Sequence, residues 1–584
     1  MSDQQQPTGK KKIGPLEVIE RVGNALPDPV FLFVIGAVLV MVLSHLAVVM
    51  NVEVQPKTAI EVVDAATGET SLALIPKQIE AVDADTGEVL LDDAGNPVMQ
   101  DAPPERATSL LTRDGFYWAI RTMTDNFINF APLGVVLVGM LGIGVAEKTG
   151  LLAAVLKLFM LVVPKFALTP TLVFLGIMSS LGSDAGYIVL PPLAAALYKS
   201  IGRSPLVGIA AVFAGVAAGF NANLLVTSLD PLLANLSTIG ANVIDPDYVV
   251  APTSNWMFMI ASTFIITMTG WAITSLVVER RYKRKPADEG GPAPMSPEEL
   301  DSQRLRPEEI RAVMIAGAVA LIVVAITLAL ILIPNAPLHG PGFAEPPTGN
   351  GTRGLVPGKT NNLTDFFDRW VESIVPLLFL GFVIPGLAYG VVMKNVRNTK
   401  DAAKMMIDSM ADMAPIVVLA FFAGQFIAYF GYSNIGRMLA MAGGELLFTS
   451  GLPGPMLILA FILVTAVFNM FVGSMSAKYT LFAPIFIPML MFVGISPELT
   501  QAAYRIGDSI TNIITPLNAY LVIVLVFMQK HCPKGGMGTL IAMMFPYTVG
   551  FGIVWSIMIV VWMTFDLPLG IPPETGPLTY QMVQ

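Results

Sequence analysis

Residues 484–507 read PIFIPMLMFVGISPELTQAAYRIG, and residues 192–215 read PLAAALYKSIGRSPLVGIAAVFAG, so the second half of the chain repeats part of the first. At an offset of 292 residues, seven of the 24 aligned positions are identical. Average residue usage would give roughly two identities in such a window. Both copies contain a Gly-x-Ser-Pro turn, at 202–205 and 494–497, and together they indicate an internal repeat.

An interrupted apolar region overlaps the start of each copy. The two regions cover residues 168–201 and 456–493, and each contains a polar break, at 182–186 (GSDAG) and 473–478 (GSMSAK). A helix needs about 20 apolar residues to cross the hydrocarbon core of a bilayer. The arms beside each break are shorter than this, and irregular backbone is tolerated at membrane depth only where protein or water surrounds it. We therefore expect both regions to be re-entrant helical hairpins.

The composition of the whole chain is that of a membrane protein. Of its 584 residues, 54% are hydrophobic, and the 13% that are charged are about half of the roughly 25% typical of a soluble domain. The net charge of −9 provides no basic surface for a nucleic-acid partner. A single cysteine, Cys532, excludes a disulfide framework, and three scattered histidines are too few for a histidine-ligated metal site.

Apolar stretches predict nine transmembrane helices in addition to the two hairpins. They lie at 28–50, 127–163, 205–235, 254–278, 310–333, 368–394, 409–447, 497–528 and 538–563. Cytoplasmic loops carry an excess of lysine and arginine. Residues 10–12 and 280–285 are strongly basic, whereas residues 51–112 contain twelve acidic residues against three basic ones, and the tail 564–584 has no basic residue. We therefore expect a bacterial inner-membrane protein with a cytoplasmic N-terminus and a periplasmic C-terminus.

The predicted organisation follows from these spans. It comprises a cytoplasmic tail (1–27), the first span (28–50), a periplasmic insert and approach (51–126), a first repeat (127–278, with hairpin 168–201), a cytoplasmic linker (279–309), scaffold helices (310–394), a second repeat (395–563, with hairpin 456–493) and a periplasmic tail (564–584). In the insert, short apolar runs flank the turns DAATGE (64–69) and DADTGE (83–88). Such runs predict β-hairpins, and hence a small β-rich cap.

The two repeats have opposite orientations in this topology. The first hairpin enters from the cytoplasm and the second from the periplasm, and each is followed by a helix broken near the midplane. Inverted repeats with discontinuous helices are the construction of secondary transporters. An enzyme is disfavoured because the chain has no H-E-x-x-H, G-x-S-x-G or P-loop motif. A passive channel is disfavoured because closed hairpins favour alternating access. The predicted fold class is thus an all-α polytopic membrane protein.

Charged and amide side chains occur in the interrupted regions. They are Asp184, Lys478, Arg505 and Asp508, with Asn221, Asn223, Asn469 and Asn512 nearby. A charge at membrane depth is costly and usually functional. Arg505 and Asp508 are three residues apart, so on a helix they share a face and can pair, and Asn512 lies on the same face one turn further on. Of two further acids, Glu147 is interpreted as interfacial, and for Asp230 a structural and a functional role both remain open.

Two coupling ions are consistent with these residues, and no bound cofactor is required. Because the predicted core has no histidine, proton coupling would use Asp184 or Asp508. Sodium coupling would use amide oxygens of Asn221, Asn223, Asn469 and Asn512, with a possible Na⁺ site at Asn223, Asn469 and Asp508. The positive character given by Arg505 and Lys478 suits an anionic substrate such as a carboxylate.

Several motifs resemble one known family. These are residues 474–490 (SMSAKYTLFAPIFIPML), 496–509 (SPELTQAAYRIGDS), 511–516 (TNIITP), 182–187 (GSDAGY) and 423–430 (AGQFIAYF), and they closely resemble the AbgT family. That family contains p-aminobenzoyl-glutamate transporters and sulfonamide-exporting antimetabolite pumps. The resemblance extends from the first span to the last.

The resemblance implies a homodimer that moves folate catabolites of the p-aminobenzoyl-glutamate type, or sulfonamides, by alternating access at the expense of the proton motive force. It implies a substrate path between the hairpins, at Asp184, Asn469, Ser476, Pro497, Arg505, Asp508 and Pro516. Tyr479 stands where the family commonly has tryptophan, and its ring is expected to stack on an aromatic substrate. The alternative is a sodium-coupled carrier of an organic anion such as a dicarboxylate.

Overall fold

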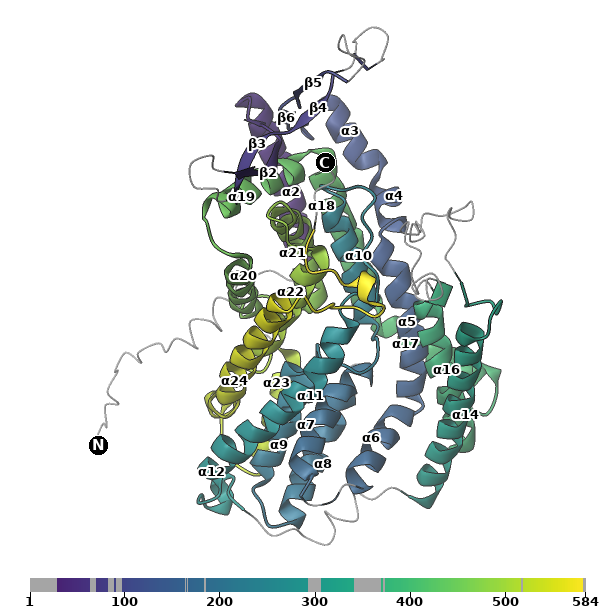
Figure 1. Cartoon of the computed structure of the whole chain (residues 1–584). Coiled ribbons are helices and arrows are strands. Elements are labelled where there is room, and N and C mark those ends of the chain that lie inside the picture. Colours follow the sequence, from purple (N-terminus) through teal and green to yellow (C-terminus); the bar gives the residue numbers. More distant parts are fainter. Residues whose placement is uncertain are drawn as a thin grey trace, which may run out of the picture.

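A computed structural model describes residues 29–63, 70–81, 89–90, 97–162, 164, 166–182, 185–292, 306–340, 369–370, 373–515 and 518–580. The chain in these ranges is mostly helical, with three small β-ladders gathered at one end (Figure 1). Asp184 and Pro516, two of the predicted path residues, lie outside these ranges.

The insert after the first helix, α2 (Pro29–Val49), is rich in β-structure, as predicted. Strands β2 (Lys57–Val63) and β3 (Thr70–Pro76) pair in an antiparallel ladder, and the predicted turns at 64–69 and 83–88 lie outside the described residues. Two further antiparallel ladders join β1 (Glu53–Val54) to β6 (Glu105–Arg106) and β4 (Gln78–Glu80) to β5 (Met99–Asp101). Helices α3 (Arg113–Arg121) and α4 (Met123–Ile128) then lead into the bundle.

The first repeat contains two interrupted helical segments. Its elements are α5 (Ala131–Lys148), α6 (Leu151–Val162), α7 (Leu168–Met178), η1 (Ser179–Gly182), α8 (Ala185–Ser200), α9 (Pro205–Phe213), η2 (Ala214–Ala218), α10 (Leu229–Ala241), α11 (Trp256–Ile273), η3 (Thr274–Val278) and α12 (Glu279–Tyr282). The apolar stretch 127–163 is bent by 65° between α5 and α6. The bend falls at Gly150, whose φ of +88° suits glycine.

The second repeat shows the same order of breaks. Its elements are α17 (Thr399–Asp412), α18 (Ala414–Tyr432), α19 (Ile435–Thr449), α20 (Gly454–Asn469), α21 (Met475–Met491), α22 (Pro497–Thr511), α23 (Ala519–Gln529) and α24 (Met537–Thr564). Between the repeats lie α14 (Pro307–Leu332) and α16 (Ile374–Val392). The stretch 409–447 is thus divided at Asn434, where φ is +60°.

Local geometry repeats at the positions that match in sequence. Gly202 and Gly494 both have positive φ, +73° and +80°. The serine two residues after each glycine donates a hydrogen bond to a carbonyl oxygen of a later segment that folds back over the turn. Ser204 Oγ is 2.5 Å from Gly290 O, and Ser496 Oγ is 2.6 Å from Pro577 O. A segment after each repeat, which contains Gly290 in one case and Pro577 in the other, thus covers the Gly-x-Ser-Pro turn of that repeat, and we call these segments the straps.

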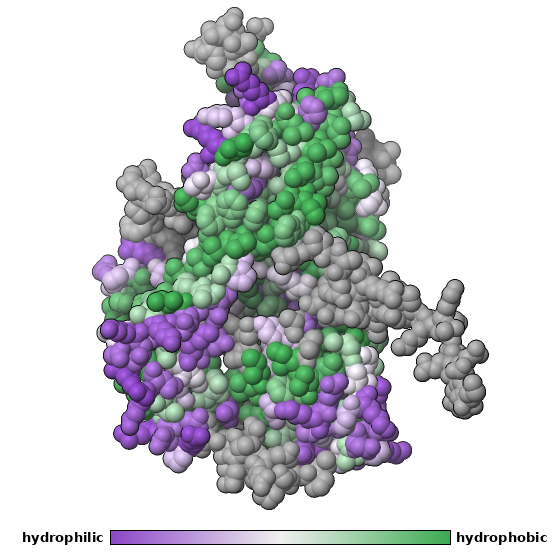
Figure 2. All heavy atoms as spheres, turned by 180° about the vertical axis from the view of Figure 1, so that it is seen from behind, coloured by the Kyte–Doolittle hydropathy of each residue, from purple (hydrophilic) through white to green (hydrophobic). Residues whose placement is uncertain are grey.

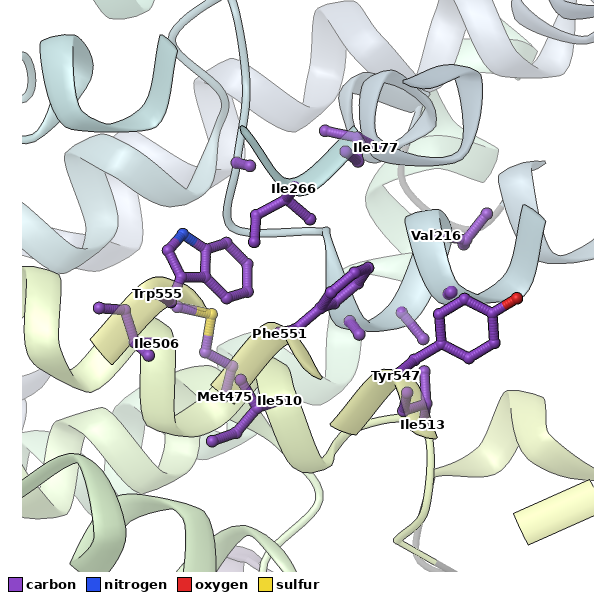
Figure 3. Packing of buried hydrophobic residues seen from close by; sticks show 14 of the residues in the cluster. Ile177, Val216, Ile266, Met475, Ile506, Ile510, Ile513, Tyr547, Phe551 and Trp555 are labelled. Carbon is purple, nitrogen blue, oxygen red and sulfur yellow. The ribbon is translucent and has the colours of Figure 1, made fainter. Parts of the chain in front are cut away.

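Hydrophobic side chains of both repeats form one continuous core. Figure 3 shows Ile177 of α7 and Ile266 of α11 in the same cluster as Ile506 of α22 and Phe551 of α24. Two smaller clusters join α2 to α18 and α5 to α14 and α16. Because burial of apolar surface is the dominant favourable term in folding, the two repeats are stabilised as one unit.

Six helices in the described part of the chain are long and apolar enough to cross a membrane, and the bent pair α5–α6 is a seventh candidate. The other apolar helices are shorter and occur beside breaks. Figure 2 shows a broad hydrophobic surface on the molecule, with hydrophilic patches beyond it. This arrangement is that of a multi-pass membrane protein. The finer count of nine spans and two hairpins remains a prediction.

Candidate functional site

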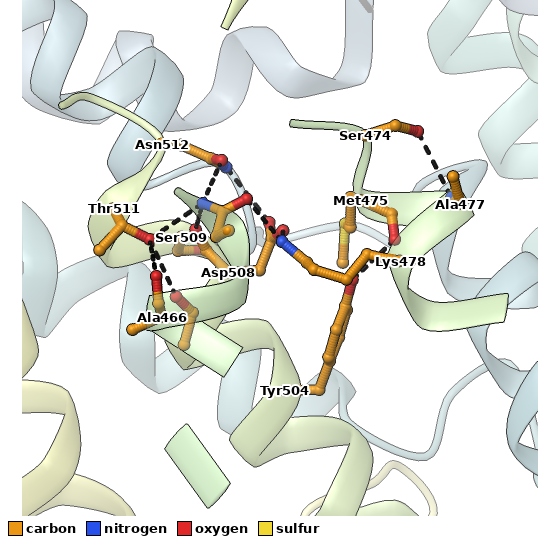
Figure 4. A network of polar contacts seen from close by, with 12 residues as sticks. Ala466, Ser474, Met475, Ala477, Lys478, Tyr504, Asp508, Ser509, Thr511 and Asn512 are labelled. Carbon is orange, nitrogen blue, oxygen red and sulfur yellow. Dashed lines mark hydrogen bonds and ion pairs between the residues drawn. The ribbon is translucent and has the colours of Figure 1, made fainter. Parts of the chain in front are cut away.

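A polar network lies where α20, α21 and α22 meet, in the second repeat (Figure 4). Helix α21 begins after Ser474, whose Oγ accepts a hydrogen bond from the Ala477 amide, and α22 begins after Ser496, whose Oγ accepts one from the Leu499 amide. Serine is a favoured residue at this helix-capping position. The two caps place the polar residues of α21 and α22 beside the end of α20.

Lys478 and Asp508 form a buried ion pair in this network. Lys478 Nζ is 2.6 Å from Asp508 Oδ1, and the two side chains are 1% and 0% exposed. The same ammonium donates to Asn469 Oδ1 at 2.5 Å. Removing one partner of a buried ion pair leaves an uncompensated charge and costs about 3–5 kcal/mol. The pair therefore links α21 to α22, and loss of either partner alone is costly.

Two asparagines complete the surroundings of this pair. Asn469 Nδ2 donates to Asp508 O at 2.7 Å and to Asn512 Oδ1 at 2.8 Å, and Asn512 Nδ2 donates to Asp508 Oδ2 at 3.2 Å. Asn469, Asp508 and Asn512 of the predicted set are thus brought together. Here the Lys478 ammonium contacts both Asn469 and Asp508, two of the three residues predicted for a sodium site.

Arg505 forms a second buried ion pair, and its partner comes from the first repeat. Arg505 Nη2 is 2.5 Å from Asp230 Oδ1, and Arg505 Nε donates to Asn255 Oδ1 at 3.2 Å. The other oxygen of Asp230 accepts from the backbone amide and the hydroxyl of Thr227. Asp230 lies in the first turn of α10, directly after the break in the first repeat.

The pairing of Arg505 with Asp508 that helical spacing allows is not the one found in the structure. Although both residues are on α22, Arg505 binds Asp230 of α10 and Asp508 binds Lys478 of α21. A buried charge requires close, hydrogen-bonded compensation. Neighbouring helices provide it here with side chains that approach α22 from different sides. Asp230, whose role was open from the sequence, is a central member of the site.

Asn221 and Asn223 lie in the break between η2 and α10. Asn221 Nδ2 donates to Arg505 O and to Ser509 Oγ, so it joins the network of α22. Asn223 Nδ2 donates to Ser180 Oγ at 2.5 Å, next to the break in the first hairpin. Both amide oxygens are buried and receive no hydrogen bond within the described ranges. They are therefore available to a water molecule, a cation or a substrate donor.

Tyr479 is fully buried against neighbouring side chains. Its hydroxyl is 2.6 Å from Ser237 Oγ, and Ser237 also donates to Gln501 Oε1 at 2.7 Å. The Tyr479 ring lies 4.3 Å from that of Tyr504, centroid to centroid. The ring expected to stack on a substrate thus joins α10, α21 and α22 in this conformation.

The remaining predicted residues lie at the ends of helices. Ser476 is half-buried in the first turn of α21, and its Oγ is 3.4 Å from Ser474 Oγ. Pro497 is the first residue of α22 and is buried. Sequence reasoning missed Asn255 and Glu498, which contact each other beside Arg505. Their polarity at the edges of apolar spans was the available signal.

An apolar cavity opens beside the network. Its volume is ≈ 630 Å³, and Thr511, whose hydroxyl accepts a hydrogen bond from Asn469, is one of its lining residues. The other lining residues come from α20, the residue after it, the segment after α22, and α24, and include Leu463, Met470, Ile541 and Phe545. Pockets of roughly 300–1,000 Å³ are typical for drug-sized molecules.

Comparisons with known proteins agree on one family. The family model described as "AbgT putative transporter family" matches residues 15–576. The p-aminobenzoyl-glutamate transport protein of Escherichia coli (strain K12) is 30% identical over 553 residues, which cover 94% of this chain and 95% of that protein.

Two solved structures are similar over nearly the whole chain. The YdaH transporter of Alcanivorax borkumensis is 38% identical with a TM-score of 0.74, and the match covers 93% of this chain and 100% of that one. MtrF of Neisseria gonorrhoeae, from a class of antimetabolite efflux pumps, is 37% identical with a TM-score of 0.77, over 94% of this chain and 97% of that one.

Proposed function

The chain belongs to the AbgT transporter family, and from that premise we propose that it is a secondary active transporter of p-aminobenzoyl-glutamate-type folate catabolites, of sulfonamide antimetabolites, or of both. Family membership makes it a multi-pass membrane transporter and not an enzyme. The proton motive force drives the transport, which proceeds by alternating access with the two hairpins as gates.

One observation carries this proposal: the ion pair between Arg505 of α22 and Asp230, directly after the break of the first repeat, joins the two repeats. Alternating access requires contacts between the repeats that exist in one state and are lost in another. A substrate carboxylate is also a partner for the guanidinium, since arginine binds carboxylates in a bidentate way. An incoming carboxylate would therefore compete with Asp230 and loosen the contact between the repeats.

The aromatic part of the substrate has suitable partners nearby. Tyr479 and Tyr504 lie on the same side of the site as Ser237, and aromatic rings prefer offset or edge contacts with one another. The apolar cavity beside Thr511 is large enough for an aminobenzoyl or sulfanilamide group. These features support an aryl carboxylate or aryl sulfonamide as substrate.

Proton coupling is proposed to run through Asp508, or through Asp184 of the first hairpin. In the described structure the Lys478 ammonium compensates the charge of Asp508. Protonation of Asp508 would neutralise its carboxylate and leave the Lys478 ammonium without its counter-charge, which would loosen α21 from α22 and bias the second hairpin toward opening. Both substrate and proton must bind the two access states differently for one gradient to drive the other.

The proposal includes the assembly and the topology. We expect nine spans and two hairpins, a cytoplasmic N-terminus and a periplasmic C-terminus in the inner membrane, and a homodimer. Helix α14 exposes large apolar side chains in the single chain, with Leu321 72% and Ile322 59% exposed. Lipid or a partner subunit would cover such a surface, which is consistent with the expected membrane assembly.

Sodium coupling is the second candidate, and the unpaired amide oxygens of Asn221 and Asn223 favour it. Oxygen ligands from broken helices bind sodium in transporters of similar construction. In this version the substrate is an organic anion such as a dicarboxylate. Because Asn469 and Asp508 are held by Lys478 here, a sodium ion at Asn223, Asn469 and Asp508 requires that this lysine moves away.

The test uses purified protein in liposomes with an imposed pH gradient and no sodium. Labelled p-aminobenzoyl-glutamate and a labelled sulfonamide are followed in parallel. Gradient-dependent accumulation of either solute is the expected result, and the preferred solute identifies the physiological class. Accumulation only with a sodium gradient would replace proton coupling by sodium coupling. No movement of either solute under both gradients would refute the proposal.

A further inference from the structure

Glu498 is a buried carboxyl group that the proposed mechanism leaves unused. It is the second residue of α22, and its side chain is only 2% exposed. Its Oε2 accepts a hydrogen bond from the Tyr248 hydroxyl at 2.9 Å. No lysine or arginine in the described ranges forms an ion pair with it, in contrast to Asp508 and Asp230. Burial of a carboxylate without a cation is far more costly than burial of the neutral acid.

The equivalent position of the first repeat shows that the fold does not require this carboxyl. At the offset of 292 residues, Glu498 corresponds to Leu206, the second residue of α9. Leu206 is completely buried, and the serines that precede both residues make the same type of hydrogen bond to a strap. The first repeat thus has the apolar Leu206 where the second has the ionisable Glu498, which points to a function for Glu498.

Glu498 is linked directly to the site through Asn255. Asn255 Nδ2 donates to the backbone oxygen of Glu498 at 3.0 Å, and its Oδ1 accepts from Arg505 Nε at 3.2 Å. The side chain of Asn255 therefore connects the start of α22 to the Arg505 guanidinium, so that a movement of one is transmitted to the other. Tyr479, which lies beside Arg505, is also within electrostatic reach of Glu498.

On its other side, Glu498 is linked through Tyr248 to the C-terminal segment that contains Tyr580. The Tyr248 ring packs edge-on against Tyr580, with centroids 5.7 Å apart, and Tyr580 donates to Asp245 Oδ2 at 3.3 Å. Asp245 and Tyr248 belong to the segment between α10 and α11, and both are partly exposed. The titratable and charged groups around Glu498 are thus Tyr248, Tyr580, Asp245, Tyr479 and Arg505.

We propose that Glu498 is a proton-binding site of the transport cycle, loaded from the periplasmic side past Tyr248 and coupled to Arg505 through Asn255. A proton from periplasmic water binds the Glu498 carboxylate, and the neutral acid then fits the closed, buried arrangement around Tyr248. Release of that proton to the cytoplasmic side, when the site faces the cytoplasm, leaves a carboxylate that needs water, which favours return to the state that is open to the periplasm. This inference rests on the proposed function, because it assigns a site to the coupling proton.

The test compares Glu498→Gln, which keeps the shape but cannot titrate, with Glu445→Gln as a matched control on the half-exposed pair Lys57–Glu445. In liposomes, exchange of labelled p-aminobenzoyl-glutamate or sulfonamide at equal pH reports substrate movement, and accumulation under a pH gradient reports coupling. We expect E498Q to exchange the labelled substrate at equal pH but not to accumulate it under a pH gradient. In the wild type, a gradient of one pH unit coupled to one proton per substrate supports about tenfold accumulation. E445Q should behave as the wild type.

A second variant keeps the carboxyl in place. Tyr248→Phe removes the hydroxyl that donates to Glu498, and a donated hydrogen bond favours the charged form of a carboxyl group. We expect the pH profile of driven transport to shift to higher pH in Y248F. An unchanged profile, or full driven accumulation by E498Q, would overturn the inference while the proposed function stands.

An infrared measurement separates the two proposals if neither solute moves in the wild type. In that case the proposed function fails. The carbonyl band of a protonated carboxylic acid is then followed with pH in substrate-free wild type and E498Q. A band that titrates in the wild type and is missing from E498Q supports the proton site. Identical spectra of the wild type and E498Q at every pH overturn it.

Discussion

Arg505 reaches from α22 to Asp230 at the start of α10, with Nη2 2.5 Å from Oδ1 and both side chains almost fully buried. The two residues are 275 positions apart in the chain and belong to different repeats. Asp230 directly follows the break of the first repeat, so the pair ties that break to a helix of the second repeat. Under the proposed function, a substrate carboxylate would compete for this charge contact.

The Arg505 guanidinium is predicted to be essential for its geometry as well as its charge. In Arg505→Lys the charge remains, but the contacts to Asp230 and Asn255 are not both kept, since lysine lacks the planar fork. We expect the KM for an anionic substrate to rise about tenfold or more, a cost of roughly 1.4 kcal/mol. Initial rates of uptake into liposomes measure this effect.

Arg203→Lys is the matched control for that substitution. Arg203 binds Glu279 in a bidentate manner, with Nε and Nη2 at 2.7 and 2.6 Å from the two oxygens. It belongs to the turn of the first repeat and not to the site. An equal rise in KM in both variants would contradict a direct role of Arg505.

The buried pair between Lys478 and Asp508 is predicted to govern both stability and coupling. Asp508→Ala leaves the Lys478 ammonium without its partner, so we expect about 3–5 kcal/mol of destabilisation and no driven transport. The double variant Lys478→Met/Asp508→Leu should regain much of that stability, because an apolar pair of similar volume avoids the desolvation cost. Unfolding in detergent measures stability, and a double variant as unstable as D508A would refute this account.

Tyr479 is predicted to stabilise the site through its hydroxyl. Tyr479→Phe leaves Ser237 with Gln501 as its one remaining side-chain partner, and we expect a loss of about 1 kcal/mol in unfolding free energy. Tyr504→Phe is the control, because its hydroxyl donates to the Met475 backbone oxygen instead. If substrate preference changes in Y479F and not in Y504F, the Tyr479 hydroxyl contributes to specificity.

The two matched glycines are predicted to be equally sensitive to substitution. Gly202 and Gly494 have φ values of +73° and +80°, and an L-residue in the left-handed region costs about 1–2 kcal/mol. Gly202→Ala and Gly494→Ala should each lower the unfolding free energy by that amount. Gly536→Ala is the control, since Gly536 has φ −106° and open space at its Cβ position. A loss confined to one repeat would contradict equivalent turns.

The C-terminal strap is predicted to detach at alkaline pH. Burial, together with the nearby Asp245 carboxylate, raises the pKa of Tyr580 to about 12. The ordinary pKa of tyrosine is near 10, so this docking is fully stabilising below about pH 10 and is lost as the pH rises through the raised value. Protease cleavage of the strap should therefore increase between these values. Tyr580→Phe should remove this step, and a wild-type profile in that variant would contradict the assignment.

Much of the site was predictable because the polar residues of one repeat lie close together along the chain. Asn469, Lys478, Asp508 and Asn512 all flank the breaks of the second repeat, and the fold gathers them into one network. The helix periodicity also placed Asp508 and Asn512 on one face, where they contact each other. The same periodicity failed for Arg505 and Asp508, because helical spacing does not show which neighbouring helix approaches.

The sequence by itself determined that the chain is a membrane protein with two matching, broken repeats, because composition and the spacing of glycine, proline and apolar residues are local properties. The sequence motifs also identified the family, which the comparisons confirm. Only the tertiary structure decided the partners: Asp230 for Arg505, Lys478 for Asp508, and Tyr248 for Glu498. Buried charges are compensated by whichever residue the packing of distant helices brings within hydrogen-bonding distance, and that is a property of the assembled core.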